Sequence, residues 1–291
     1  MDVTREGPVP ADFAAGTTGT TGTAGAVAPE AGRGRGERGG STPALHLSGL
    51  VKAFDGRTAV DRVTLSVPRG SFFGLVGPNG AGKTTTLSMA VGLLRPDAGR
   101  AHILGVDVWE DPARAKELVG VLPDGMALPE RLTGRELLTY MGLLRGLPAD
   151  TVVRRVEELL AVLELADAER TLVVDYSAGM RKKIGLATAL LHAPRLLVLD
   201  EPFEAVDPVS ATTIRTILRR FVDAGGAVVL SSHVMTLVEQ MCDHVAVIAA
   251  GRVAASGPLE LVRGTGSLEE AFVHLVGGRT GGAEGLSWLA S

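Results

Sequence analysis

A glycine-rich stretch followed by a lysine and a threonine is the part of the chain whose residue types most directly predict chemistry. It reads GPNGAGKT, Gly77 to Thr84, and fits the pattern G-x-x-x-x-G-K-[ST]. Its glycines let backbone N–H groups turn inward around phosphate oxygens, and the helix expected to begin near Gly82 adds a favourable dipole. We therefore predict a phosphate loop, with an ordinary glycine-rich turn as the alternative. The residues expected to contact the nucleotide are Gly77, Pro78, Asn79, Gly80, Ala81, Gly82, Lys83, Thr84 and Thr85.

Two carboxylates at the end of an apolar run form the expected second part of the site. The run is LLVLDEP, residues 196–202, and the carboxylates are Asp200 and Glu201. Charged groups that end a buried strand are costly unless a metal or hydrogen bonds compensate them. We expect Asp200 to bind Mg²⁺ and Glu201 to position the attacking water. In the glycine-rich loop, Lys83 is expected to reach the β- and γ-phosphates and Thr84 to bind Mg²⁺.

A histidine at the end of a further strand is the third candidate. His233 directly follows the sequence VVLSS. A single histidine is more often structural than functional. If the strands are parallel, however, His233 lies at the same sheet edge as Lys83 and Glu201. We therefore predict that it contacts the γ-phosphate.

Strands and helices that alternate along the chain must position these residues. Runs of alternating or continuous apolar residues predict strands, and apolar residues at three- and four-residue spacing predict helices. The strands are expected at 45–54, 59–67, 72–77, 195–202, 226–233 and 243–257, and the longer helices at 134–146, 151–165 and 208–222. This alternation predicts an α/β fold with a mostly parallel sheet that is covered on both faces.

The two ends differ in composition from the rest of the chain. Residues 1–43 contain ten Gly and seven Thr but no Leu or Ile, so they bury too little apolar surface to offset chain entropy. We predict a disordered N-terminal tail. Its sequence GRGRGERGG, residues 32–40, could touch acidic lipid or RNA, although we favour a solvated extension. Residues 278–291 are expected to form a flexible C-terminal end.

The composition of the whole chain argues against several classes of protein. Its 291 residues are 45% hydrophobic, which is enough for a buried core. A net charge of -4 gives no basic footprint for nucleic acid. Cys242 is the only cysteine, so we expect no internal disulfide. We expect no membrane span, because no apolar run reaches about 18 residues. We also expect no secretory signal, because the N-terminus lacks a charged start followed by an apolar stretch.

The order and spacing of the motifs resemble the ATP-binding-cassette family, the nucleotide-binding subunits of ABC transporters. The resemblance covers about residues 44–277 and rests on the phosphate loop, LLVLDEP, YSAGM, EAVD and SSH. It implies a P-loop NTPase core with a mostly parallel sheet flanked by helices. It further implies an N-terminal antiparallel β-subdomain, an inserted α-helical subdomain at about 124–190, and ATP and Mg²⁺ as ligands.

The sequence YSAGM, Tyr176 to Met180, resembles the family's signature motif L-S-G-G-Q, which contacts ATP held by a second subunit. Ser177 and Gly179 match that motif, whereas Tyr176, Ala178 and Met180 depart from it. By themselves these residues also fit an ordinary helix start with Ser177 as its N-cap. The resemblance assigns Ser177 and Gly179 to the partner's ATP, for which the helix N-terminus would supply N–H groups and a favourable dipole.

Three further residues are assigned by the resemblance. Asp207 in EAVD matches the loop that meets the partner's phosphate loop, and with Pro208 it is also a good helix start. Phe54 matches the aromatic that stacks on adenine, with a core phenylalanine as the alternative. Asp124 stands where most of the family has Gln, and exporters often Glu, to bind Mg²⁺ and position water. Its shorter arm predicts coordination through a water, or slower hydrolysis.

The resemblance also implies a function. The tyrosine-containing signature and SLEEAFVHLVGG, residues 267–278, resemble bacterial exporter-type cassettes of the multidrug or antibiotic efflux kind. The implied protein is an ATPase with Glu201, His233 and Lys83 as catalytic residues. It would form a homo- or heterodimer with a second nucleotide-binding subunit and power a separately encoded membrane permease from the cytoplasmic face of the cell membrane. The alternatives are a soluble cassette ATPase acting on ribosomes or DNA and a binding-only partner in an asymmetric dimer.

Overall fold

The computed structural model describes residues 42–277, so the predicted C-terminal end and residues 1–41 of the predicted N-terminal tail lie outside the described residues. The strands are β1 (Leu45–Phe54), β2 (Arg57–Val67), β3 (Phe72–Val76), β4 (Ala98–Ile103), β5 (Val106–Asp107), β6 (Val119–Leu122), β7 (Leu196–Leu199), β8 (Ala227–Ser232), β9 (His244–Ala249) and β10 (Arg252–Pro258). The α-helices are α1 (Lys83–Ala90), α2 (Pro112–Leu118), α3 (Gly134–Leu144), α4 (Ala149–Val162), α5 (Ala178–Leu190), α6 (Pro208–Asp223), α7 (Met235–Met241), α8 (Leu259–Arg263) and α9 (Leu268–Val276). Two short 3-10 helices, η1 (Ala166–Ala168) and η2 (Val173–Asp175), precede α5.

A six-stranded sheet positions most of the predicted site. Its strand order is β10-β9-β3-β8-β7-β6, and every neighbouring pair from β9 to β6 is parallel, which confirms the predicted mostly parallel sheet. Only β10 is antiparallel to its neighbour. Because parallel strands end at the same edge, the residues that follow β3, β7 and β8 come together there. These residues include the phosphate loop, Asp200 and His233.

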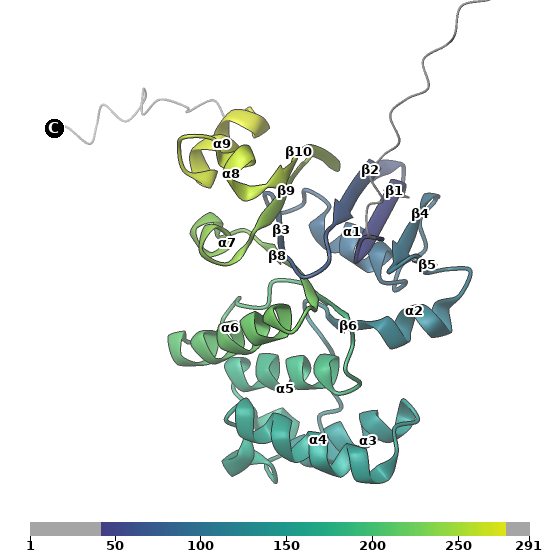
Figure 1. Cartoon of the computed structure of the whole chain (residues 1–291), viewed down its shortest axis with the longest axis vertical. Coiled ribbons are helices and arrows are strands. Elements are labelled where there is room, and N and C mark those ends of the chain that lie inside the picture. Colours follow the sequence, from purple (N-terminus) through teal and green to yellow (C-terminus); the bar gives the residue numbers. More distant parts are fainter. Residues whose placement is uncertain (1–41, 278–291) are drawn as a thin grey trace, which may run out of the picture. The chain divides into compact units, whose positions relative to one another are not determined.

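The second sheet is antiparallel and has the order β2-β1-β4-β5 (Figure 1). A tight turn joins β1 to β2, with Asp55 at φ 46° and Gly56 at φ 79°. The sequence gives no signal for β4. Its residues AGRAHI lack a clear alternation, and the first three of them are exposed.

The core lies on both faces of the six-stranded sheet, and alternate residues of one strand belong to different faces. Phe72 and Val76 of β3 pack in a hydrophobic cluster with α3 to α7. Phe73 and Leu75 pack in a second cluster with α1 and the antiparallel sheet. The sheet is therefore buried on both sides, which explains why its strands read as continuous apolar runs.

The helices α3, α4 and α5 lie within the stretch predicted to be helical, and α5 lies between α6 and the α3–α4 pair (Figure 1). The helix predicted at 151–165 is wrong at its end, because α4 stops at Val162. Glu164 has φ 56°, a left-handed conformation that ends the helix, and its carboxylate lies 3.1 Å from the Lys183 ammonium. None of the helices between residues 42 and 277 is long and apolar enough to cross a membrane.

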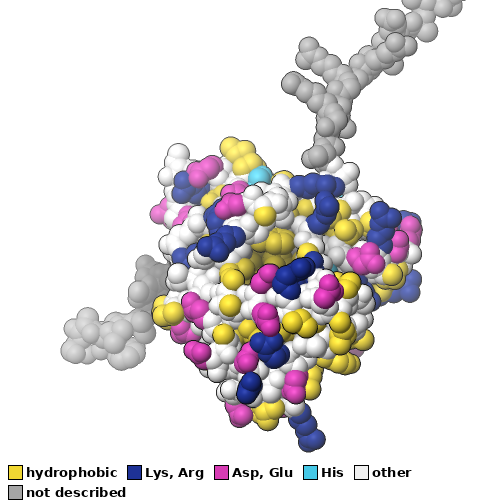
Figure 2. All heavy atoms as spheres, turned by 60° about the horizontal axis from the view of Figure 1, so that its bottom comes forward, with side chains coloured by type: hydrophobic (Ala, Val, Ile, Leu, Met, Phe, Trp, Pro, Cys, Tyr) yellow, Lys and Arg dark blue, Asp and Glu magenta, His cyan; other side chains and the backbone are white. Residues whose placement is uncertain are grey.

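Charges of both signs are interspersed on the face of the molecule that Figure 2 shows. Lysine and arginine side chains lie there among aspartate and glutamate side chains, and hydrophobic side chains line a hollow near the centre. This face does not present the basic stripe that nucleic-acid binding needs.

Candidate functional site

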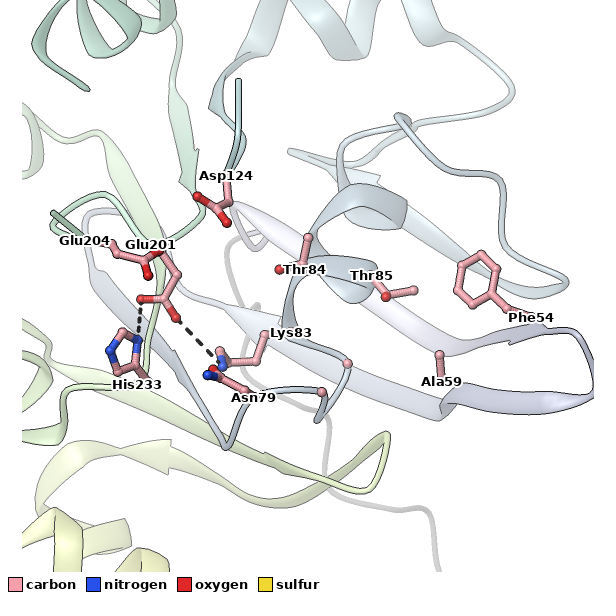
Figure 3. Close-up of a pocket in the computed structure, with 12 residues that line it drawn as sticks. Phe54, Ala59, Asn79, Lys83, Thr84, Thr85, Asp124, Glu201, Glu204 and His233 are labelled. Carbon is pink, nitrogen blue, oxygen red and sulfur yellow. Dashed lines mark hydrogen bonds and ion pairs between the residues drawn. The ribbon is translucent and has the colours of Figure 1, made fainter. Parts of the chain in front are cut away.

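A pocket of about 510 Å³ opens at the edge where the parallel strands end (Figure 3). Most of the residues that line it were predicted from the sequence, although they come from five separate segments of the chain. The lining residues are Phe54, Ala59, Asn79, Gly80, Gly82, Lys83, Thr84, Thr85, Asp124, Glu201, Glu204 and His233.

The glycine-rich loop connects β3 to α1, and two of its glycines are required by their surroundings. A Cβ atom on Gly77 would lie 2.3 Å from the carbonyl oxygen of Ile248, and one on Gly82 would lie 2.5 Å from that of Ala59. Gly82 also has φ 101°, which L side chains rarely adopt. It is the N-cap of α1, so the N-terminus of that helix faces the loop. This arrangement is suited to an anion.

Lys83 lies at the base of the pocket. Its ammonium donates hydrogen bonds to the carbonyl oxygens of Gly77, at 2.8 Å, and Pro78, at 3.3 Å. The same nitrogen lies 3.8 Å from Oε1 of Glu201. The side chain is only 7% exposed, so its charge acts in a poorly solvated site. The lysine is thus already directed at the loop that it is predicted to serve.

Glu201 lies between Lys83 and His233 (Figure 3). Its Oε2 is 3.1 Å from Nδ1 of His233, and its backbone N–H donates a hydrogen bond of 2.8 Å to Oγ of Ser231. The residue has φ 45°, which is uncommon outside glycine and marks a conformation held by its neighbours. The predicted base, the predicted histidine and the phosphate-loop lysine therefore form one contiguous group.

Asp200 lies behind the pocket and is not one of the residues that line it. It is only 4% exposed and accepts a hydrogen bond from Oγ of Ser231. A buried carboxylate is costly without a nearby cation, and Thr84 presents a hydroxyl in the pocket wall. Among residues 42–277, no cluster of three or more His, Cys, Asp or Glu could hold a metal. The donors fit Mg²⁺, which typically uses one or two carboxylates together with substrate phosphates.

Phe54 and Asp124 lie at the rim. Phe54 is 46% exposed and lines the pocket, so the alternative that it is a core residue is wrong. Its role towards adenine remains a prediction. Asp124 is 47% exposed, and its Oδ1 lies 3.6 Å from Nζ of Lys182. Its predicted role as a metal ligand is likewise untested.

The signature residues are not part of this pocket. Ser177 is exposed at the start of α5 and caps it, since its Oγ accepts a hydrogen bond of 3.2 Å from the N–H of Met180. Gly179 packs against the start of α6, where a Cβ would lie 2.9 Å from Oδ2 of Asp207. Neither residue lines the pocket around Lys83. Within the described residues, the signature motif is therefore a separate surface that presents the N-terminus of α5.

Asp207 caps α6, as predicted from the sequence Asp-Pro. Its Oδ1 accepts hydrogen bonds from the backbone N–H groups of Ser210, at 2.9 Å, and Val209, at 3.0 Å. The hydrogen bond from the Ser210 backbone is the main reason that the pKa of Asp207 lies below its usual value. Its predicted meeting with a partner's phosphate loop is not tested by these contacts.

The tyrosine of the signature motif has a structural role. Tyr176 is buried, which raises the pKa of its hydroxyl, and this hydroxyl donates a hydrogen bond of 3.0 Å to the carbonyl oxygen of Ala168. Gly134 leaves room for the hydroxyl, since a Cβ there would lie 2.2 Å from it. Tyr176 therefore fastens the start of α5 to the helical region.

Replacing Tyr176 with phenylalanine should lower the free energy of unfolding by about 1 kcal/mol, because the Ala168 carbonyl loses its partner. Urea denaturation measures this change. Tyr140→Phe is the matched control, since Tyr140 is exposed on α3 and should give no change. Equal stability of the Tyr176→Phe chain and the wild type would show that the hydrogen bond contributes nothing.

Sequence analysis did not predict that Lys182 and Ser231 contact the carboxylate residues of the site. Ser231 links Asp200 to the backbone of Glu201. Lys182 reaches both Asp124 and the backbone of Glu201 from α5. The sequence offered only a cluster of basic residues, RKK, directly after the signature motif. Such a cluster usually indicates a solvated helix face.

Comparison with known proteins finds a large group of similar chains. The family described as "ABC transporter" matches residues 60–204. The daunorubicin/doxorubicin resistance ATP-binding protein of Streptomyces peucetius is 41% identical over 74% of this chain and 66% of its own length. The Nod factor export ATP-binding protein I of Ralstonia nicotianae is 40% identical over 77% of this chain and 70% of its own. This chain thus spans about two thirds of these relatives.

A solved structure agrees with the fold. The structure of an ATP-binding subunit of an ABC transporter is 30% identical, with a TM-score of 0.75. The match covers 80% of this chain and 99% of that one. The fold is therefore shared over nearly the whole of the solved subunit.

Proposed function

The chain belongs to the ABC transporter family, as one of its ATP-binding ATPase subunits, and from this premise we propose that it powers export through a separately encoded membrane permease. The observation that carries the proposed mechanism is the group around Glu201, which combines a carboxylate, a histidine and the phosphate-loop lysine in one pocket. Export is supported by relatives named for drug resistance and for Nod factor export.

ATP would enter the pocket with its phosphates in the glycine-rich loop and its adenine against Phe54. Lys83 would exchange its hydrogen bond with the Gly77 carbonyl for phosphate oxygens. Thr84 and Asp200 would hold Mg²⁺, which when bound would neutralise phosphate charge. Asp124 would approach this cation from the rim.

Hydrolysis then depends on residues of this chain. Glu201 would accept a hydrogen bond from water and polarise it for attack on the γ-phosphate. His233, which contacts Glu201, would donate a hydrogen bond to the γ-phosphate, and Lys83 would stabilise charge that develops there. The contacts among these side chains hold Glu201 in place before ATP arrives, which reduces the cost of ordering it later.

We also propose that each ATP lies between two nucleotide-binding subunits, in a homodimer or a heterodimer. Ser177 and Gly179 would contact ATP held by the partner, because the exposed start of α5 offers N–H groups and a positive dipole end. Asp207 lies beside Gly179 and would meet the partner's phosphate loop. ATP binding would close the dimer, and hydrolysis would reopen it.

This chain would dock on the permease at the cytoplasmic face of the membrane. The contact would lie near the helical region and the loop after Asp124. A groove of about 680 Å³ between α2 and the end of α3 is suited to this contact. Its lining residues are Ala113, Lys116, Glu117, Met141, Leu144, Arg145, Leu147 and His192. The mixture of apolar and charged groups is typical of a subunit interface.

Affinity purification of the tagged chain from detergent-solubilised cells tests this function. We expect one membrane protein to co-purify in stoichiometric amount and to raise ATP hydrolysis by the chain. Mutation of Leu144 to Glu in the groove should release that protein, while Leu93→Glu, an exposed residue outside the groove, should not. Recovery of ribosomes instead of a membrane protein would contradict the proposal, as would a complex without ATPase activity.

A further inference from the structure

A lysine of the signature helix joins two parts of the site that are far apart in the sequence. Lys182 lies in the second turn of α5. Its ammonium donates a hydrogen bond of 2.9 Å to the carbonyl oxygen of Glu201 and lies 3.6 Å from Oδ1 of Asp124. The Lys182 side chain is 18% exposed, whereas that of Asp124 is 47% exposed. Lys182 is not one of the residues that line the pocket around Lys83.

The backbone at Glu201 needs such a contact. Its φ of 45° is unfavourable for a residue other than glycine. The following Pro202 restricts it further. The conformation is held on one side by Ser231, which accepts from its N–H, and on the other by Lys182, which donates to its C=O. Loss of either contact should let the Glu201 carboxylate leave its place beside Lys83 and His233.

The contact with Asp124 adds a second function to the same ammonium. Asp124, Lys182 and Ala178 line a cavity of about 290 Å³ beside the start of α5. Asp124 is half exposed, so its ion pair with Lys182 contributes little to stability. It does place the Asp124 carboxylate beside the same ammonium that contacts the Glu201 peptide. The positions of Asp124 and Glu201 therefore both depend on one side chain of α5.

We propose that Lys182 is a positioning residue for ATP hydrolysis, which holds the Glu201 peptide and the Asp124 carboxylate in one arrangement and ties both to the signature helix. The inference rests on the proposed ATPase mechanism and deepens it. Ser177 begins the helix that carries Lys182. The helix that would contact the partner's ATP is therefore linked to the Glu201 peptide of the same chain through a single side chain.

Steady-state hydrolysis by Lys182→Met, Lys182→Arg and the wild type tests this role. The methionine variant keeps the length of the side chain but cannot donate, so kcat should fall about tenfold or more, since small misplacements of catalytic groups have effects of this size. Its KM for ATP and its affinity for a non-hydrolysable ATP analogue should stay within about twofold of wild type, because Lys182 does not line the pocket. The arginine variant keeps the positive charge and the N–H donors and should recover most of kcat.

Arg154→Met is the matched control, because it removes one positive charge from an exposed position of α4. It should hydrolyse ATP as the wild type does. Analogue binding reports that each variant is folded, and Lys182→Leu, which also lacks a donor, replaces the methionine variant if the latter does not bind.

Three results would overturn the role of Lys182. The first is a wild-type kcat in Lys182→Met, and the second is a loss of kcat in Lys182→Arg as large as in Lys182→Met. The third is a change in KM with no change in kcat. A wild-type chain that binds ATP but never hydrolyses it, alone or with its permease, would instead refute the proposed ATPase mechanism.

Discussion

Glu201→Gln should reduce ATP hydrolysis by a factor of about 100 or more while leaving ATP binding intact. Glutamine has nearly the shape of glutamate and can still fill the space between Lys83 and His233. It cannot polarise water as a carboxylate does. Because closure precedes hydrolysis in the proposed cycle, this variant should accumulate as an ATP-dependent dimer. Phosphate release measures the first effect, and sedimentation velocity with and without ATP measures the second.

Glu204→Gln is the matched control for this prediction. Glu204 also lines the pocket and carries the same charge, whereas the carboxylate that lies beside Lys83 and His233 is that of Glu201. We expect turnover by the Glu204 variant to stay within about threefold of wild type, since it removes no group placed on the reacting water. Rapid phosphate release by Glu201→Gln, or loss of turnover only in the Glu204 variant, would show that the base is wrongly assigned.

Ser177→Arg should leave ATP bound to the Lys83 loop of its own chain but reduce hydrolysis by about 100-fold or more, because transition-state contacts from the partner are lost. Ser177 is exposed and lies outside the pocket around Lys83. A bulky arginine at the start of α5 would block the approach of the partner's ATP. Equilibrium binding of an ATP analogue and phosphate release from the same samples separate the two effects.

Two other substitutions at Ser177 separate loss of the phosphate contact from loss of the helix cap. Arginine removes the N-cap of α5, whereas aspartate and threonine retain an oxygen that can accept from Met180. Ser177→Asp should therefore keep the wild-type unfolding temperature but lose turnover, since its charge repels phosphate. Ser177→Thr should keep nearly the wild-type unfolding temperature and most of the turnover. Normal turnover by Ser177→Asp would show that the signature motif is not a phosphate contact.

The parts of the fold and site that the sequence predicts are those with strong local signals. The phosphate loop is fixed by glycines that cannot carry a side chain, and the caps at Ser177 and Asp207 need only nearby N–H groups. The sheet edge that gathers Lys83, Glu201 and His233 follows from apolar strands that run parallel. Each strand, loop and cap is specified by a few consecutive residues, and the parallel pairing of the strands then brings their ends together.

The features that the sequence does not predict arise from contacts between distant segments. Lys182 is one of several basic residues on α5, and only the fold brings it to Glu201 and Asp124. Phe54 had two equal interpretations until the structure placed it at the pocket rim. The end of α4 was mispredicted because apolar residues continue past Val162, whereas the backbone is left-handed at Glu164. The Glu164 carboxylate lies beside Lys183, which is 19 residues further along the chain.

A mixture of two inactive variants tests most directly whether the ATP site is built from two chains. Lys83→Ala should lose ATP binding in its own phosphate loop but keep an intact signature motif. Ser177→Asp should bind ATP in its own phosphate loop but lack a working signature motif. Each variant alone should release little phosphate. When the two are co-expressed and purified together, one complete site can form in each mixed dimer, so hydrolysis should return. Phosphate release no greater than the sum of the separate variants would contradict a shared site.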